Sequence, residues 1–294
     1  MILRRVVLCA AVSAMLCLTT AWVAQAQQGS MRMYNTAKQK LKEGKKIVGG
    51  TVSTSDPDIY CAMANAGFDF TWIEMQHSPL THHEVARMIW ACRGASAIPF
   101  IRVADATEGE IQKATDNGAL GIIVPMVDTV EKAEAAVKFA KYPPVGRRSQ
   151  GGGQYRALWG ADYRQTFNDN LIVVAMIENP AGVDIADKIA AVPGVDVVFI
   201  ASTDLGSFSG LQQGNPKYEA LVTRAREAIL KAGKTVGGPH AWKDREGYHF
   251  FQGAGETSLI RSGAQAALGA APAPSGRRSG ARPGVAPTEG EEPK

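Results

Sequence analysis

Two kinds of apolar pattern alternate along most of the chain. Short, near-continuous apolar runs are typical of strands in a parallel sheet, because both faces of each strand are covered. Apolar residues at helical spacing occupy the stretches between these runs. The predicted strands are residues 46–52, 68–75, 98–103, 121–126, 172–178, 195–201, 235–239 and 250–254. The predicted helices are residues 57–66, 81–95, 108–117, 130–141, 181–191, 217–232 and 242–248, with a short final helix at 262–268.

Eight strands separated by helices predict a parallel α/β fold and favour a (β/α)8 barrel over an open sheet. Residues 27–269 carry this pattern, and a single (β/α)8 barrel typically needs about 250 residues. One connection, residues 142–170, is long and contains three consecutive glycines at 151–153. Long connections in compact domains are usually functional, so this segment is a candidate lid or contact between subunits.

The two ends of the chain have patterns of their own. Arg4 and Arg5 precede an apolar run over residues 6–23, and Ala24-Gln25-Ala26 has the small-x-small form of a cleavage site. Residues 1–26 are therefore expected to be a signal peptide whose removal leaves no stable membrane span. Export to the periplasm follows from this interpretation, with a cytoplasmic location as the alternative. Residues 270–294 are rich in Pro, Gly and charge, which indicates a disordered tail.

Composition narrows the class of protein. The sequence is 45% hydrophobic and 20% charged, which excludes a wholly disordered chain, and its net charge of +4 is too small to indicate nucleic-acid binding. No predicted strand ends in a lysine that would suit Schiff-base chemistry. Cys61 and Cys92 remain after signal removal, and the sequence has no Cys/His cluster of the zinc-binding kind. Their spacing is compatible with one disulfide or with two buried thiols.

Acidic residues end two neighbouring predicted strands. Glu178 ends the fifth strand, and Asp204 follows the sixth, 26 residues later. Because reactive side chains of a (β/α)8 barrel come from the carboxyl ends of its strands, we expect these carboxylates to meet. They suit a hard or borderline ion such as Mg²⁺, Mn²⁺ or Co²⁺, with substrate oxygens and water completing the coordination. The alternative is that Glu178 caps the helix near Pro180 and Asp204 caps a turn.

Three further polar side chains are expected at the same rim. Glu74 and His77 follow the second predicted strand, and Arg102 ends the third. His77 precedes Ser78-Pro79 in a rigid turn and suits a general base whose other ring nitrogen is oriented by Glu74. The Arg102 guanidinium suits a carboxylate or a developing enolate oxygen. A histidine bonded to the loop backbone and an ordinary ion pair of Arg102 are the alternatives.

Six segments together resemble the motifs of the HpcH/HpaI aldolases. They are GFDF and WIEMQHSP within residues 67–79, IRV at 101–103, ALGIIVPMV at 119–127, YPPVGRR at 142–148, IE at 177–178 and TDL at 203–205. Their order and spacing match over residues 45–268. The resemblance implies a TIM barrel of the phosphoenolpyruvate/pyruvate superfamily type, often a homo-oligomer with an exchanged final helix.

The activity that the resemblance implies is that of a metal-dependent class II aldolase. Such an enzyme cleaves 4-hydroxy-2-oxo acids to pyruvate and an aldehyde through a metal-stabilised enolate. Glu178 and Asp204 would ligate the metal, His77 would accept the proton, and Arg102 would stabilise the transition state. The substrates would be a small 2-oxo acid and an aldehyde.

The resemblance also implies roles for three further residues, and at two other positions this sequence differs from the family pattern. Ser202 and Thr203 would hold the pyruvyl carboxylate through backbone N–H groups. Asp116 matches a family acid that raises the basicity of the histidine, although its place at the end of a helix predicts the opposite rim. Gln76 stands where the family has an acid, and Met176 stands where it has a substrate-binding Gln. These two departures leave open a 2-oxo-acid-binding protein, or another enolate-forming lyase or decarboxylase on the same scaffold.

Overall fold

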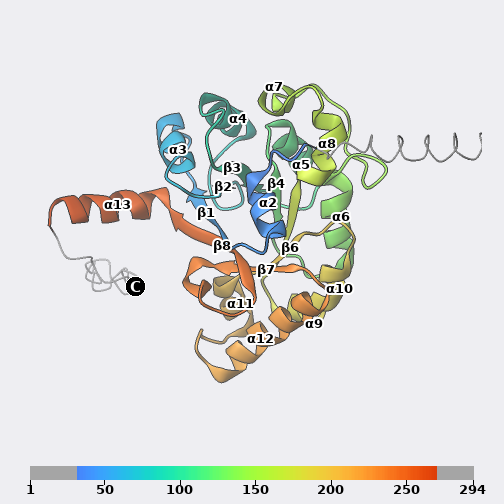
Figure 1. Ribbon diagram of the computed structural model, residues 1–294. Helices are drawn as coiled ribbons and strands as arrows, with labels where there is room; N and C mark the ends of the chain where they lie inside the picture. Colours follow the sequence, from blue (N-terminus) through green and yellow to red (C-terminus); the bar gives the residue numbers. More distant parts are fainter. Residues whose placement is uncertain (1–31, 270–294) are drawn as a thin grey trace, which may run out of the picture. The chain divides into compact units, whose positions relative to one another are not determined.

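A computed structural model describes residues 32–269, and its eight strands form a closed parallel barrel (Figure 1). Each strand pairs with the strands before and after it in sequence, and β8 closes the barrel against β1. The predictions of eight strands and of a (β/α)8 barrel are confirmed. The strands are β1 (Ile47–Val52), β2 (Phe70–Glu74), β3 (Ile98–Arg102), β4 (Gly121–Val124), β5 (Ile172–Ile177), β6 (Val197–Ile200), β7 (Thr235–Pro239) and β8 (Tyr248–Gly255).

Aromatic side chains fill the inside of the barrel. Phe70 stacks on Phe100 and Phe250 with ring centroids 4.5 and 4.7 Å apart, and all three rings are fully buried. Glycine makes room for them, because a Cβ at Gly49 would overlap Phe70 and a Cβ at Gly121 would overlap Phe100. The barrel is thus a packed core rather than a pore, and ligands are left to its rim.

Helices surround the barrel, and most lie where the pattern predicts them (Figure 1). The predicted helix 181–191 is broken at Ile185, and the predicted helix 242–248 is wrong. There the structure has one 3₁₀ turn followed by the early start of β8. The helices that the pattern missed are α2 (Thr36–Lys42), α7 (Tyr155–Trp159), α8 (Tyr163–Asn170) and α11 (Ser202–Ser209). The others are α3 (Pro57–Ala64), α4 (His82–Ala91), α5 (Glu108–Asp116), α6 (Val130–Ala140), α9 (Pro180–Asp184), α10 (Ala186–Ala191), α12 (Pro216–Lys231) and η1 (His240–Trp242).

The long connection 142–170 is ordered around one buried arginine. The Arg148 side chain is fully buried, and its Cζ atom lies 4.5–5.5 Å from the ring centroids of four aromatic residues. Arg148 also donates hydrogen bonds to Asp116 Oδ1 at 2.8 Å and to the Tyr163 hydroxyl at 2.9 Å. The rings belong to Tyr142, Tyr155, Tyr163 and Phe167. Helices α7 and α8 therefore pack around a cation held by rings and one carboxylate.

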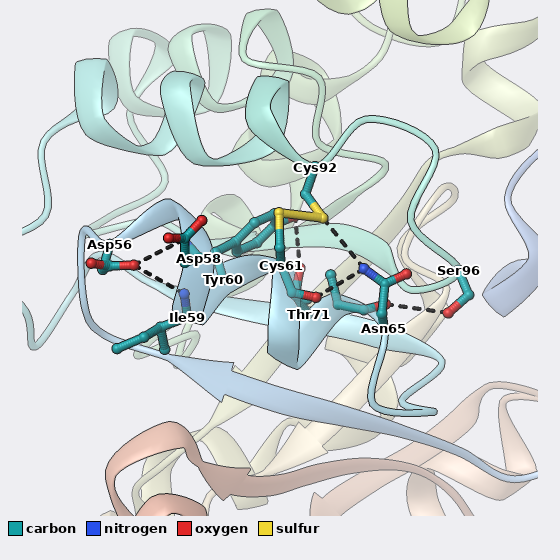
Figure 2. The surroundings of a disulfide bond; sticks show 10 residues. Asp56, Asp58, Ile59, Tyr60, Cys61, Asn65, Thr71, Cys92 and Ser96 are labelled. Atoms are coloured by element: carbon teal, nitrogen blue, oxygen red, sulfur yellow. Dashed lines mark hydrogen bonds between the residues drawn. A yellow bond between two sulfur atoms is a disulfide. The ribbon is translucent and has the colours of Figure 1, made fainter.

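Cys61 and Cys92 are paired as a disulfide, which decides between the two alternatives for these cysteines (Figure 2). Their Cα atoms lie 5.3 Å apart, within the range that a disulfide spans. The bond joins α3 to the end of α4, and Asn65 donates a hydrogen bond to the Cys92 sulfur at 3.4 Å. The closed loop contains β2 and the turn that carries His77, so the two helices flanking this strand are tied covalently.

Within the described chain, residues 257–269 form a unit separate from the barrel. Helix α13 (Glu256–Ala267) begins earlier than the predicted final helix. The predicted signal peptide (1–26) and tail (270–294) lie outside the described residues. None of the helices within residues 32–269 combines the length and apolar character needed to cross a bilayer.

Candidate active site

A cavity of about 180 Å³ opens where the carboxyl ends of the strands meet. It contains six of the residues that the sequence predicted to act together. Those six residues are His77, Arg102, Met176, Ser202, Thr203 and Asp204. The rest of its lining consists of Phe199, Ala201, Pro239 and Gln252. Residues from six strands or strand ends thus converge on a space suited to a small molecule.

Arg102 reaches this cavity with its position fixed by Glu74. Its Nε and Nη2 atoms lie 2.6 and 2.5 Å from Glu74 Oε2, and both residues are buried. Trp72 also donates to Glu74 Oε2 at 3.2 Å, and the guanidinium lies 5.6 Å from the Trp72 ring centroid. Because β2 and β3 place Glu74 directly opposite Arg102, the ion pair follows from strand register. The partner of Arg102 is therefore a strand acid and not a loop acid.

Glu74 also fastens the turn that carries His77. Its Oε1 atom accepts the backbone N–H groups of Gln76 and His77 at 2.9 and 3.0 Å, and the Ser78 hydroxyl donates to its carbonyl. The predicted contact between Glu74 and the His77 ring is thus replaced by contacts to the backbone. The imidazole itself lines the cavity and is exposed. This arrangement holds the turn in place while leaving both ring nitrogens available to a ligand.

Glu178 is buried directly after β5, and Asp204 in the first turn of α11 is its neighbour. Burial raises the pKa of Glu178, and the neighbouring Asp204 carboxylate raises it further, whereas the Met126 N–H bond opposes this shift. That N–H donates to Glu178 Oε1 at 3.0 Å. Met126 has φ of 52°, the one positive value at a non-glycine residue within the described part of the chain. The cap of α9 is Asn179, so Glu178 does not serve as a helix cap.

The two carboxylates fit a divalent cation. Like charges held together in a buried place raise the pKa of one carboxylate, and a bound cation removes that repulsion. Within residues 32–269 there is no group of three or more His, Cys, Asp or Glu side chains able to hold an ion. Two protein carboxylates therefore suit a hard ion whose other positions belong to substrate and water.

Helix α11 points an uncapped amino end at the same cavity. The helices that follow β1 to β5 each begin at a side chain that accepts a backbone N–H, from Asp56, Thr81, Thr107, Thr129 and Asn179. Helix α11 begins instead after Ala201, which has no such side chain. The first N–H groups of α11, around Ser202 and Thr203, are left for an anionic ligand.

Asp116 is not brought to this cavity by the described chain. It lies at the end of α5 and pairs with Arg148 at 2.8 Å and with Gln112 Nε2 at 2.9 Å. This position at the end of α5 agrees with the expectation that Asp116 lies at the rim opposite the cavity. Its role in catalysis stays a prediction, as do the roles of the residues that do converge.

The sequence did not predict four of the lining residues, which are Phe199, Ala201, Pro239 and Gln252. Gln252 could have been predicted, because it is a polar residue that interrupts the apolar run of the last predicted strand. Phe199, Ala201 and Pro239 gave no such signal, since an apolar residue in a predicted strand looks the same whether it faces the core or a ligand.

Comparisons with known proteins identify the family of this chain. The family model described as HpcH/HpaI aldolase/citrate lyase matches residues 51–248. A hydroxypyruvate/pyruvate aldolase of Pseudomonas aeruginosa is 34% identical over 210 residues, which cover 69% of this chain and 78% of the relative. A 2-keto-3-deoxy-L-rhamnonate aldolase of Escherichia coli (strain K12) is 30% identical over 208 residues, with the same coverage of the two chains.

Solved structures lead to the same family. The crystal structure of an HpcH/HpaI aldolase/citrate lyase family protein from Burkholderia cenocepacia J2315 matches with a TM-score of 0.73 and 28% identity. The match covers 80% of this chain and 98% of that one. The chain therefore belongs to the HpcH/HpaI aldolase/citrate lyase family and is an enzyme of its carbon–carbon lyase class.

Proposed function

We propose that this lyase cleaves 4-hydroxy-2-oxo acids to pyruvate and an aldehyde, with a divalent metal as its cofactor. The observation that carries the proposal is the convergence of His77, Arg102 and the uncapped end of α11 on one cavity beside two carboxylates. Each of these groups matches a separate part of such a substrate.

The 2-oxo-acid end binds at the β5–β6 side of the cavity. The N–H groups at the start of α11 receive the substrate carboxylate, because a helix amino end attracts anions. Met176 on the same side offers only its thioether, whose sulfur lies 4.0 Å from Arg102 Nη1, so Met176 itself contacts the carbon atoms of the 2-oxo acid and leaves its oxygens to the other groups.

His77 and Arg102 supply the proton transfer and the charge stabilisation. The His77 ring accepts the proton of the 4-hydroxyl group as the C3–C4 bond breaks. Arg102, held by Glu74, donates hydrogen bonds to the oxygen on which negative charge develops. The fixed guanidinium needs no reorganisation during the reaction, which is the condition for effective electrostatic catalysis.

Glu178 and Asp204 would hold the metal, for which Mg²⁺, Mn²⁺ and Co²⁺ are the candidates. When bound, the metal would act as a Lewis acid that makes the keto acid a better electron acceptor. The Met126 N–H holds one Glu178 oxygen in place, and the Asp204 carboxylate lies beside Glu178, as expected of two ligands to one cation.

Pyruvate release from a panel of 4-hydroxy-2-oxo acids, with and without chelator, tests the proposal. We expect metal-dependent pyruvate formation that Glu178→Gln abolishes together with Mn²⁺ binding measured by calorimetry. Asp105→Asn is the matched control, because Asp105 follows β3 on the same rim and pairs with Lys132 outside the cavity. Metal-dependent binding of 2-oxo acids without any cleavage would contradict the proposal and favour a binding protein.

We further propose that the enzyme is exported and forms a homo-oligomer. The pattern of residues 1–26 supports export, and the disulfide between Cys61 and Cys92 is compatible with an oxidising compartment. A fusion reporter that remains in the cytosol would contradict export. The resemblance alone supports the oligomer, and light scattering on the purified protein measures it.

A further inference from the structure

The barrel order divides the rim of the cavity into two sectors. The groups assigned to the 2-oxo acid come from β3, β5 and β6, and His77, assigned to the 4-hydroxyl, follows β2. Because β4 lies between two strands that carry the 2-oxo-acid groups, the longest run of unassigned strands is β7, β8 and β1. In the proposed binding mode, the carbon atoms beyond C4 would occupy this sector. Within this sector the described lining consists of Pro239 and Gln252.

Gln252 is the polar side chain of that sector. Its neighbours Phe250 and Phe251 are fully buried, whereas Gln252 is half-buried and lines the cavity. The strands beside it place Gly49 and Pro239 directly opposite, and neither residue has a side chain that competes for the amide. The register between β1 and β8 shifts between Gly49 and Thr51, next to this pair. Such bulges re-aim side chains near active sites.

Thr51 fixes the orientation of the amide. The Thr51 hydroxyl donates to the Gly253 carbonyl at 3.2 Å, so towards Gln252 it acts as an acceptor. The group facing Thr51 is therefore Nε2, at 3.4 Å from the hydroxyl oxygen. Among residues 32–269, Gln252 Oε1 has no hydrogen-bond partner, and this acceptor remains available to a ligand.

We propose that Gln252 is a specificity-determining residue that binds a hydroxyl group on C5 of the substrate, so that the aldehyde partner is an α-hydroxy aldehyde. The inference rests on the proposed function. Within this sector the amide lies beside Pro239, and no charged side chain of the described lining belongs to the sector, so the amide suits a hydroxyl rather than a charged group. When an aldehyde without that hydroxyl binds, the Gln252 amide is buried without a hydrogen-bond partner. The transition state with that aldehyde is therefore less stable.

The condensation of pyruvate with glycolaldehyde, compared with acetaldehyde, tests this role. In each reaction pyruvate loses a methyl proton, the C3–C4 bond forms, and the aldehyde oxygen gains a proton. The two aldehydes differ in intrinsic reactivity, so the decisive quantity is the change that a variant makes in the ratio of their kcat/KM values. For Gln252→Leu we expect kcat/KM with glycolaldehyde to fall by about 10- to 100-fold and the value with acetaldehyde to stay within about twofold.

A second variant keeps the test valid if Gln252→Leu fails to fold. Thr51→Val removes the hydroxyl that orients the amide and keeps the shape of the side chain. We expect a smaller loss, about two- to fivefold, mainly in KM and only with glycolaldehyde. An unchanged ratio in the folded variants would overturn the role of Gln252. Absence of condensation with either aldehyde in the wild-type enzyme would instead overturn the proposed function.

Discussion

Arg102 and Arg148 are both buried and both paired with a carboxylate, yet their surroundings differ. Arg102 bonds Glu74 and still lines a cavity open to ligands. Arg148 bonds Asp116 and is enclosed by four aromatic rings, with no exposed side-chain surface. Burial and an ion pair are therefore insufficient to mark a reactive arginine. What separates the two is whether one edge of the guanidinium remains free for a ligand.

Removal of Arg102 is expected to have the largest effect on the reaction. Arg102→Met should lower kcat/KM for pyruvate formation by about 10³-fold, because one preorganised donor at a developing oxyanion contributes about 3–4 kcal/mol. Steady-state kinetics at saturating metal measure this loss. Less than a tenfold change would show that Arg102 only positions Glu74.

Removal of Arg148 is expected to act on stability. Arg148→Met should lower the free energy of unfolding by about 3 kcal/mol, because Asp116 loses its partner and four rings lose a cation. Urea denaturation measures the change, with activity followed on the folded fraction. Activity lost in Asp116→Asn without a change in unfolding would break the comparison and support the catalytic role that the resemblance assigns to Asp116.

Protein stability and metal affinity should both depend on the protonation of Glu178, whose pKa is raised by burial. The folded state holds this proton more tightly than the unfolded state, so the contribution of Glu178 to stability is full below its unfolded pKa. The contribution is lost as the pH rises through the folded pKa. Metal affinity should change in the opposite sense, falling by up to about tenfold per pH unit on the acid side. Calorimetric titration with Mn²⁺ checks the metal affinity, and Glu178→Gln should remove the contribution of Glu178 to the pH dependence of unfolding.

The candidate site and the 142–170 connection also differ in backbone strain, whose expected effect on the free energy of unfolding is smaller. Met126 at the site has φ of 52°, whereas the positive φ of 107° in the 142–170 connection belongs to Gly160. Met126→Gly should raise the free energy of unfolding by about 1 kcal/mol, because glycine adopts this conformation without steric cost. Gly160→Ala is the control and should lower it. A less stable Met126→Gly variant would mean that side-chain packing, and not the backbone, decides this position.

The barrel could be predicted because its strands are apolar on both faces. Residues 235–239 were predicted with the bounds that the structure shows, and the other seven strands differ only at their ends. The predicted helix 242–248 failed because Tyr248 is fully buried at the start of β8. Helix α11 carries polar residues and glycine without a regular apolar spacing, so the pattern did not reveal it.

The candidate site could be predicted in part for the same reason. His77, Arg102, Glu178 and Asp204 are polar residues at the ends of apolar runs, which is a signal that one sequence contains. The sequence contains no comparable signal for which partners such a side chain bonds in the folded protein. That Glu74 bonds Arg102 and the backbone of the turn, rather than the His77 ring, depends on strand register.

If the uncapped start of α11 binds the substrate carboxylate as proposed, the thermal stability of the enzyme should rise with the concentration of that ligand. A helix that leaves its first N–H groups to a ligand gains the missing cap only when a carboxylate is present. At a hundredfold excess over the dissociation constant, a ligand adds about 2.7 kcal/mol to the stability of the protein it binds. The melting temperature in a series of small organic acids would therefore rank them by their fit, even where no turnover occurs.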